Sequence, residues 1–154
     1  MNQIEIKTVI ESLIDTFLYA GKVSIELRKK GLIKEIKEDN TPVTNGDLEV
    51  NRIITEKLLN LTPQIPIVSE ETSHNKSKTD LKNFWLIDPI DGTYDYINDL
   101  DEFTLNAGLI INNRAVAGII CAPAKNRLFY SYGKGCSFEI INDKHMKLDC
   151  SKIS

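Results

Sequence analysis

The sequence has few cysteines, no long apolar run and no excess of basic residues, and each absence excludes a class of protein. The three cysteines, Cys121, Cys136 and Cys150, are odd in number and widely scattered, which argues against a disulfide framework and for reduced thiols. No apolar run is long enough to span a bilayer, and the N-terminus lacks the pattern of a secretory signal peptide. We therefore expect a cytoplasmic protein without a transmembrane segment, either free or peripheral at the inner membrane.

The charge balance argues against a nucleic-acid partner. The chain has 19 basic and 22 acidic residues, for a net charge of −3, and no basic stripe that could follow a phosphate backbone. Its short basic cluster, residues 28–30, lies where a helix is expected to end, and cations are favoured there by the helix dipole. Neither His74 nor His145 is expected to be catalytic, and no cysteine has the spacing of a zinc ligand.

The first third of the sequence predicts two helices. A length of 154 residues is enough for one domain with a buried core. Apolar residues recur at helical spacing over residues 6–27, and Gly31 then suits a helix end. After a short strand at 32–36 and a polar loop at 37–42, a second amphipathic helix begins near Thr44 and ends before Pro63.

The remaining sequence predicts a run of strands. Turn residues at 112–113 and 133–135 separate alternating segments, and residues 72–83 form a polar, charged loop. We therefore expect an α+β fold in which two N-terminal helices pack on one face of a mostly antiparallel sheet. The predicted strands are residues 65–68, 84–87, 103–111, 115–121, 128–132 and 137–141.

Carboxylates follow two of these strands directly. Glu70 and Glu71 come after the first, and Asp88 begins a predicted turn after the second, with Asp91 three residues later. If the strand ends meet, these like charges raise one another's pKa unless a cation neutralises them. Carboxylates, together with the carbonyl of Ile90, are hard oxygen ligands of the kind that Mg²⁺, Mn²⁺ or Ca²⁺ prefer.

Gly92 and Thr93 follow this turn at once and add a feature typical of anion sites. Glycine lets the backbone approach a ligand closely, and free N–H groups at a helix start bind phosphate. Each short pattern also has an ordinary interpretation, however. Asp and Gly are common in turns of any kind, and Asp47 with Thr44 matches a helix capping box, a role that is compatible with catalysis.

The combined pattern resembles a known family. Three pieces, residues 41–47, 68–71 and 85–93, are similar in order and spacing to the inositol monophosphatase family of lithium-sensitive phosphatases. Within that family the sequence looks most like the bacterial 3′(2′),5′-bisphosphate nucleotidases. The further pointers are residues 39–44, 61–71, 102–104, 122–123 and 128–130.

The resemblance implies a magnesium site and assigns its ligands. Two or three Mg²⁺ ions bind in the complete family site, and this sequence could hold fewer. The ligands implied here are the carboxylates of Glu70, Asp88 and Asp91 and the carbonyl of Ile90, with Glu70 bridging two ions.

The resemblance also implies roles at the phosphate. Asp47 and Thr93 would orient and deprotonate the attacking water, and the backbone of Gly92 and Thr93 would hold the phosphate. The reaction would be an in-line attack of metal-activated water on a phosphate monoester. Around the phosphate the resemblance places Glu70, Ile90, Asp91, Gly92 and Thr93.

Two departures from the family pattern qualify this expectation. The nucleotidases usually have Lys-Glu-Phe after Gly-Thr, whereas here Tyr94 replaces the basic residue, followed by Asp95 and Tyr96. The family also has a C-terminal substrate domain with a Trp-Asp motif, and residues 1–154 match only the metal-binding N-terminal domain. The sequence therefore predicts impaired activity, and either self-association or a complementing C-terminal fragment.

Three functions stay open at this point. The first is hydrolysis of the 3′-phosphate of adenosine 3′,5′-bisphosphate, a small phosphorylated substrate of sulfur metabolism. The second is hydrolysis of an inositol or sugar monophosphate. The third is a binding module, or an inactive remnant, that retains the metal cluster.

Overall fold

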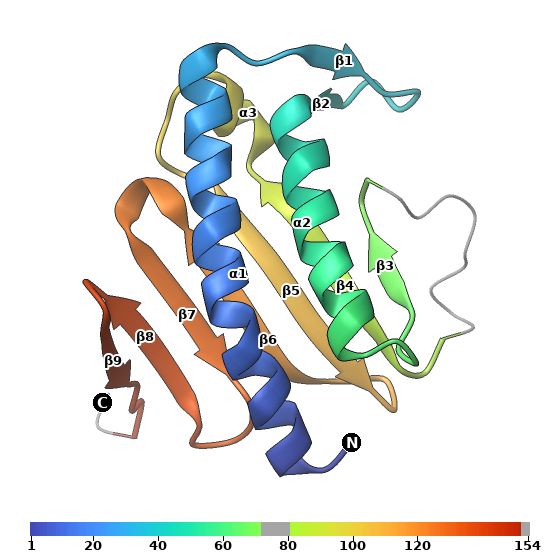
Figure 1. Ribbon diagram of the computed structural model, residues 1–154, viewed down its shortest axis with the longest axis vertical. Helices are drawn as coiled ribbons and strands as arrows, with labels where there is room; N and C mark the ends of the chain where they lie inside the picture. Colours follow the sequence, from blue (N-terminus) through green and yellow to red (C-terminus); the bar gives the residue numbers. More distant parts are fainter. Residues whose placement is uncertain (72–80, 152–154) are drawn as a thin grey trace.

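The structure is a computed structural model that describes residues 1–71 and 81–151. Two long helices lie side by side on one face of a sheet (Figure 1). The predicted loop at 72–83 and the prediction for His74 fall largely outside the described residues. No helix of the described ranges is long and apolar enough to cross a membrane.

The first helix, α1 (Gln3–Lys30), has clear signals at both ends. The side chain of Asn2 accepts a hydrogen bond from the amide of Glu5 at 2.8 Å, which satisfies one of the free amides at the helix start. Three basic residues occupy its last turn, and Gly31 follows with a φ of 95°. The helix thus ends at the predicted place, and it begins about one turn earlier than its apolar pattern predicts.

The second helix, α2 (Asn45–Leu61), begins with a capping box. The Thr44 hydroxyl accepts from the amide of Asp47, and the Asp47 carboxylate accepts from the amide of Thr44. These reciprocal bonds confirm the predicted box and fix the direction of the Asp47 side chain.

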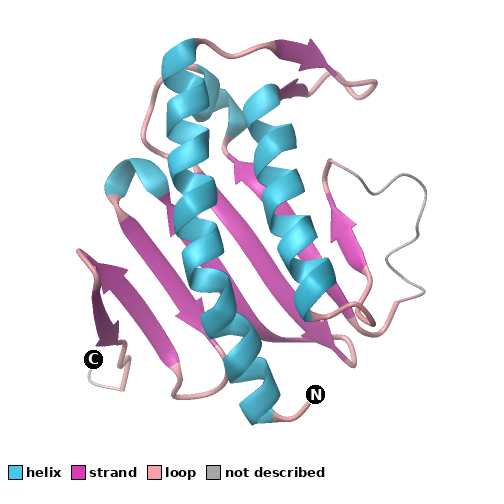
Figure 2. Ribbon diagram, viewed as in Figure 1, coloured by secondary structure: helices cyan, strands magenta, loops and turns pink. Residues whose placement is uncertain are grey.

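The sheet is mostly antiparallel, as predicted. In the described part of the chain, seven strands lie in chain order in this sheet, and the edge pair β3–β4 is the one parallel pair among them. Figure 2 shows both long helices against the same face of this sheet, which confirms the α+β fold. Its strands are β3 (Ile67–Ser69), β4 (Phe84–Asp91), β5 (Thr104–Ile111), β6 (Arg114–Ala122), β7 (Arg127–Ser131), β8 (Ser137–Ile141) and β9 (Lys144–Lys147).

The main difference from prediction concerns β4, which continues through the expected turn to Asp91. Its pairing with β5 shifts register between Asp88 and Asp91, so a bulge carries this segment. A bulge accommodates Pro89, which cannot donate a ladder hydrogen bond. Four short elements were not predicted: the hairpin strand β2 (Pro42–Thr44), which pairs with β1 (Lys34–Ile36), the helices α3 (Thr93–Ile97) and η2 (Pro123–Lys125), and β9.

The core lies between the two helices and the sheet. Phe17 of α1, Leu58 of α2 and Trp85 of β4 are fully buried there. The Trp85 indole donates to the Thr62 hydroxyl at 2.9 Å, so its polar edge is also satisfied. His145 pairs through Nδ1 with the Tyr130 hydroxyl at 2.9 Å, far along the sheet from the acidic strand ends.

Candidate metal and phosphate site

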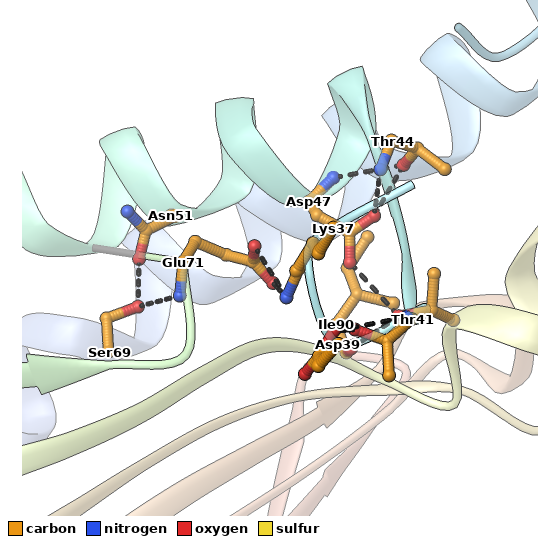
Figure 3. Close-up of polar contacts among 10 residues, drawn as sticks. Lys37, Asp39, Thr41, Thr44, Asp47, Asn51, Ser69, Glu71 and Ile90 are labelled. Carbon is orange, nitrogen blue, oxygen red and sulfur yellow. Dashed lines mark hydrogen bonds and ion pairs between the residues drawn. The ribbon is translucent and has the colours of Figure 1, made fainter. Parts of the chain in front are cut away.

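Asp47 and Thr93 meet although they are 46 residues apart. The Thr93 hydroxyl lies 3.1 Å from Asp47 Oδ1 and 3.2 Å from the carbonyl of Ile90, so it can donate to either. The other carboxylate oxygen, Oδ2, accepts from the amide and hydroxyl of Thr44 at 2.9 and 2.5 Å. Asp47 is almost fully buried. Its carboxylate is thus fixed through Oδ2 by Thr44, as Figure 3 shows, and Oδ1 is left to accept from Thr93.

The backbone between Asp91 and Thr93 has a shape that only glycine adopts readily. Gly92 is in the left-handed region, with φ 87° and ψ 43°, and it is the N-cap of α3. A Cβ on Gly92 would lie 2.7 Å from the carbonyl oxygen of Glu102. The first turn of α3 leaves amide groups without intrahelical acceptors. The chain therefore presents backbone N–H groups next to the carboxylates.

The end of β3 brings two further carboxylates toward this place. The Glu70 side chain is exposed, whereas Glu71 forms an ion pair with Lys37 at 3.2 Å. The Ser69 hydroxyl donates to Asn51 Oδ1 at 2.5 Å and accepts from the amide of Glu71 at 3.3 Å. These bonds tie the strand end to α2, as Figure 3 shows.

Electrostatic interactions show that the carboxylates share one region. Burial first, and then the charges of Asp91, Glu70, Glu71 and Asp47, raise the pKa of Asp88 to about 6. Burial also raises the pKa of Glu71, although Lys37 acts in the opposite direction. The predicted convergence of the two strand ends is therefore present in the fold.

The donor set fits a hard divalent cation. All candidate donors are carboxylate or carbonyl oxygens, and their mutual repulsion is the effect that a cation offsets. Within residues 1–71 and 81–151, no three Asp, Glu, His or Cys side chains already form a closed group around one point. Glu70 and Asp91 are exposed and Asp88 is half-buried, so a bound cation would have to draw these carboxylates together.

The sequence analysis did not predict the contacts of two residues near the site. Lys37 lies in the β1–β2 turn and reaches Glu71 across 34 residues. Tyr96 lies on α3 with its ring fully buried, and its hydroxyl donates to the carbonyl of Ser24 across 72 residues. No local pattern identifies such partners. The one available signal was their nearness in sequence to Thr44 and Thr93.

Comparison with known proteins identifies the family. The sequence profile of the Inositol monophosphatase family matches residues 5–152. The chain is 35% identical over 142 residues to the 3′(2′),5′-bisphosphate nucleotidase CysQ of Aggregatibacter actinomycetemcomitans, with 91% of this chain and 53% of the relative covered. It therefore spans about half the length of that relative.

Solved structures share the fold. The extragenic suppressor protein suhB of Bartonella henselae superposes with a TM-score of 0.75 and 21% identity, over 93% of this chain and 55% of the other. An IMPase/NADP phosphatase complexed with Mg²⁺ and phosphate superposes with a TM-score of 0.71 and 21% identity, over 84% of this chain and 49% of the other. The profile match covers nearly the whole sequence, and the chain belongs to the inositol monophosphatase family.

Proposed function

We propose that this chain is the metal-binding N-terminal domain of a magnesium-dependent phosphomonoesterase. Its substrate would be adenosine 3′,5′-bisphosphate, whose 3′-phosphate is hydrolysed to give AMP and phosphate. The observation that carries the proposal is the Thr93 hydroxyl 3.1 Å from Asp47 Oδ1, directly after the carboxylate segment of β4. The nucleotidase relative supports the choice of substrate.

In this proposal the residues of the chain divide into two groups. Glu70, Asp88, Asp91 and the Ile90 carbonyl hold Mg²⁺, which when bound lowers the pKa of water and offsets charge on the phosphate oxygens. As the attacking water loses a proton to Thr93 Oγ1, the Thr93 hydroxyl passes its own proton to Asp47 Oδ1, so the Asp47 carboxylate is the final proton acceptor. The backbone amides after Gly92 hold the phosphate oxygens.

A paired substitution at Thr93 tests the proton role. Thr93→Val keeps the shape of the side chain and removes the hydroxyl, so we expect phosphate release to fall by about 10²-fold or more, the usual contribution of a positioned proton acceptor. Thr93→Ser keeps the hydroxyl and should retain most of the activity. The assay measures phosphate released from adenosine 3′,5′-bisphosphate and from an inositol monophosphate, with Mg²⁺ and with added Li⁺.

The assay should compare the chain alone with the chain mixed with a second polypeptide. The activity of the named relative belongs to a chain about twice as long, so we expect residues 1–154 to release phosphate slowly by themselves and faster when mixed with the C-terminal half of that relative. Brisk, lithium-blocked release by the 154-residue chain alone would contradict the expected impairment. No release in either arm would contradict the proposed function.

We further propose that the sheet face opposite the helices receives another polypeptide, either a second copy or a complementing fragment. Register places Ile120, Asn106 and Asp88 on one face, and Ile120 is 44% exposed there. Leu86, two residues from Asp88, is exposed on the same face. The pairing of Ile120 through β7 and β8 to β9 places the exposed Met146 there too, at the far edge of the sheet. Apolar side chains exposed along one face of a sheet are the kind of surface that a partner can cover.

Ile120→Lys tests this surface. We expect the wild-type chain to self-associate, and the variant to have a dissociation constant at least about tenfold higher. A tenfold change corresponds to about 1.4 kcal/mol, and burying an unpaired charge costs more than that. Ile36→Lys is the matched control, since Ile36 is more exposed but lies on the separate β1–β2 hairpin. Light scattering over a concentration series gives the association state. A wild-type chain that stays monomeric at high concentration would contradict self-association.

A further inference from the structure

We propose that Tyr96 is a positioning residue for the Asp47–Thr93 pair, and that Gly46 provides the space for its hydroxyl group. The inference rests on the function proposed above, because it concerns the geometry of the two residues that would handle the proton. Tyr96 itself does not touch the candidate reacting atoms.

The Tyr96 hydroxyl joins two of the elements that surround the site. It lies on α3, three residues after Thr93, and donates to the carbonyl of Ser24 on α1 at 2.6 Å. Tyr96 and Ser24 are both fully buried. Burial also raises the pKa of the Tyr96 hydroxyl, so it stays protonated and remains a donor. The short helix that begins with Thr93 is therefore tied to a long and well-packed helix.

The same hydroxyl rests against the first turn of α2. A Cβ on Gly46 would overlap the Tyr96 hydroxyl oxygen and would lie 2.8 Å from both Cε2 and Cζ of the ring. Gly46 directly precedes Asp47 in this turn. Glycine lowers helix stability relative to alanine, so the local sequence alone does not favour it here. The close approach of the Tyr96 hydroxyl explains why a residue without a Cβ occupies position 46.

The surroundings of the ring prevent it from moving away. Phe103 packs against it with ring centroids 4.9 Å apart. The Arg28 guanidinium lies over both rings, donates to the carbonyl of Leu100 at 2.7 Å and pairs with Asp99 at 3.2 Å. Because the ring is held on these sides, a side chain larger than hydrogen at Gly46 must displace either α2 or α3.

The consequence is that one hydroxyl sets the spacing between the two halves of the proton-handling pair. Asp47 follows Gly46 on α2, and Thr93 begins α3, which also holds Tyr96. Any shift between Gly46 and Tyr96 is transmitted to the 3.1 Å contact between Thr93 and Asp47. A displacement of about 1 Å between catalytic groups is sufficient to lower the rate of a reaction strongly.

A reciprocal pair of substitutions tests the fit. Gly46→Ala should crowd the hydroxyl, lower the unfolding temperature by about 5 °C or more, and shift the NMR amide signals of Asp47 and Thr93. Tyr96→Phe should shift the same signals more modestly and lower kcat with little change in KM. The double variant Gly46→Ala/Tyr96→Phe should recover part of the stability lost in Gly46→Ala, because the closest clash, with the hydroxyl oxygen, is then gone while the contacts at 2.8 Å with Cε2 and Cζ of the ring remain.

Tyr130→Phe is the matched control. It also removes a tyrosine hydroxyl bond, the one to His145, and should lower stability without moving the Asp47 and Thr93 signals. A double variant no more stable than Gly46→Ala would overturn the fit at Gly46. Unmoved Asp47 and Thr93 signals in Tyr96→Phe would overturn the positioning role.

The stability and NMR measurements need no turnover. Failure of the wild-type chain to release phosphate under every condition would therefore count against the proposed function alone, and the fit of Tyr96 to Gly46 would still be decided by the double variant.

Discussion

Replacing Asp88 with asparagine is expected to have opposite effects on metal binding and on the stability of the metal-free chain. Mg²⁺ affinity should fall by at least about tenfold, which is the lower end of the loss caused even by removing an outer partner of a metal ligand. In the absence of metal the variant should be at least as stable as wild type, because one charge is removed from a cluster of repelling carboxylates. Calorimetric titration with Mg²⁺ and thermal unfolding with and without metal give the two quantities.

The pH dependence of unfolding shows how the Asp88 charge affects the stability of the metal-free chain. The Asp88 pKa of about 6 in the folded chain lies above its ordinary value of 3.8, so between these values the folded state binds more protons than the unfolded state. The stability of the metal-free wild type therefore falls as pH rises through this window. Asp88→Asn lacks the titration, so its advantage over wild type should grow from pH 4 to pH 6 and then level off. Mg²⁺ affinity of the wild type should rise over the same window, because binding displaces the proton.

Asp15→Asn is the control for Asp88→Asn. It removes the same charge from an exposed position on α1 and should change neither Mg²⁺ affinity nor the pH profile. An Asp88→Asn variant that binds Mg²⁺ as tightly as wild type would remove Asp88 from the ligand set.

The parts of the fold that could be predicted are those in which burial repeats along the sequence. The buried stripe of α1 includes Val9, Leu13 and Phe17, and its helical spacing is visible without a structure. β5 alternates in burial along its length and was predicted for the same reason. By contrast, β9 is exposed at every position, so no alternation marks it. It forms because β8 offers a free edge with which it can pair, and this is a tertiary effect.

The candidate site was predictable where its residues follow a strand or a helix start. Asp47 is fixed by a local capping box, and Glu70 and Asp88 follow predicted strands, so their general direction could be inferred. The continuation of β4 to Asp91 could not be inferred, because Pro89 and Gly92 favour a turn. The strand continues because a bulge in its pairing with β5 accommodates this segment. The contacts of Lys37 and Tyr96 join residues far apart in the chain. They depend on how whole elements pack, which the local sequence does not determine.

Replacing Gly92 with alanine is expected to cause a large loss of stability in the candidate site. A left-handed conformation costs a residue with a Cβ about 1–2 kcal/mol, and Gly92 has a φ of 87°. The added Cβ would also lie 2.7 Å from the carbonyl oxygen of Glu102, and this atom belongs to the backbone and cannot rotate away. Strain and overpacking together should cost on the order of 3 kcal/mol, which corresponds to a fall of roughly 6–12 °C in unfolding temperature.

Gly135→Ala separates these two causes. Gly135 also has a positive φ, 74°, but a Cβ there would meet nothing within 4 Å, so the substitution carries the conformational cost alone. We expect its unfolding temperature to fall by about 2–4 °C for each kcal/mol of strain, clearly less than for Gly92→Ala. Equal losses at the two positions would mean that the Glu102 carbonyl does not restrict Gly92. A larger loss at Gly92 accompanied by weaker Mg²⁺ binding would show that folding and the metal site both depend on the close approach of Gly92 to the Glu102 carbonyl.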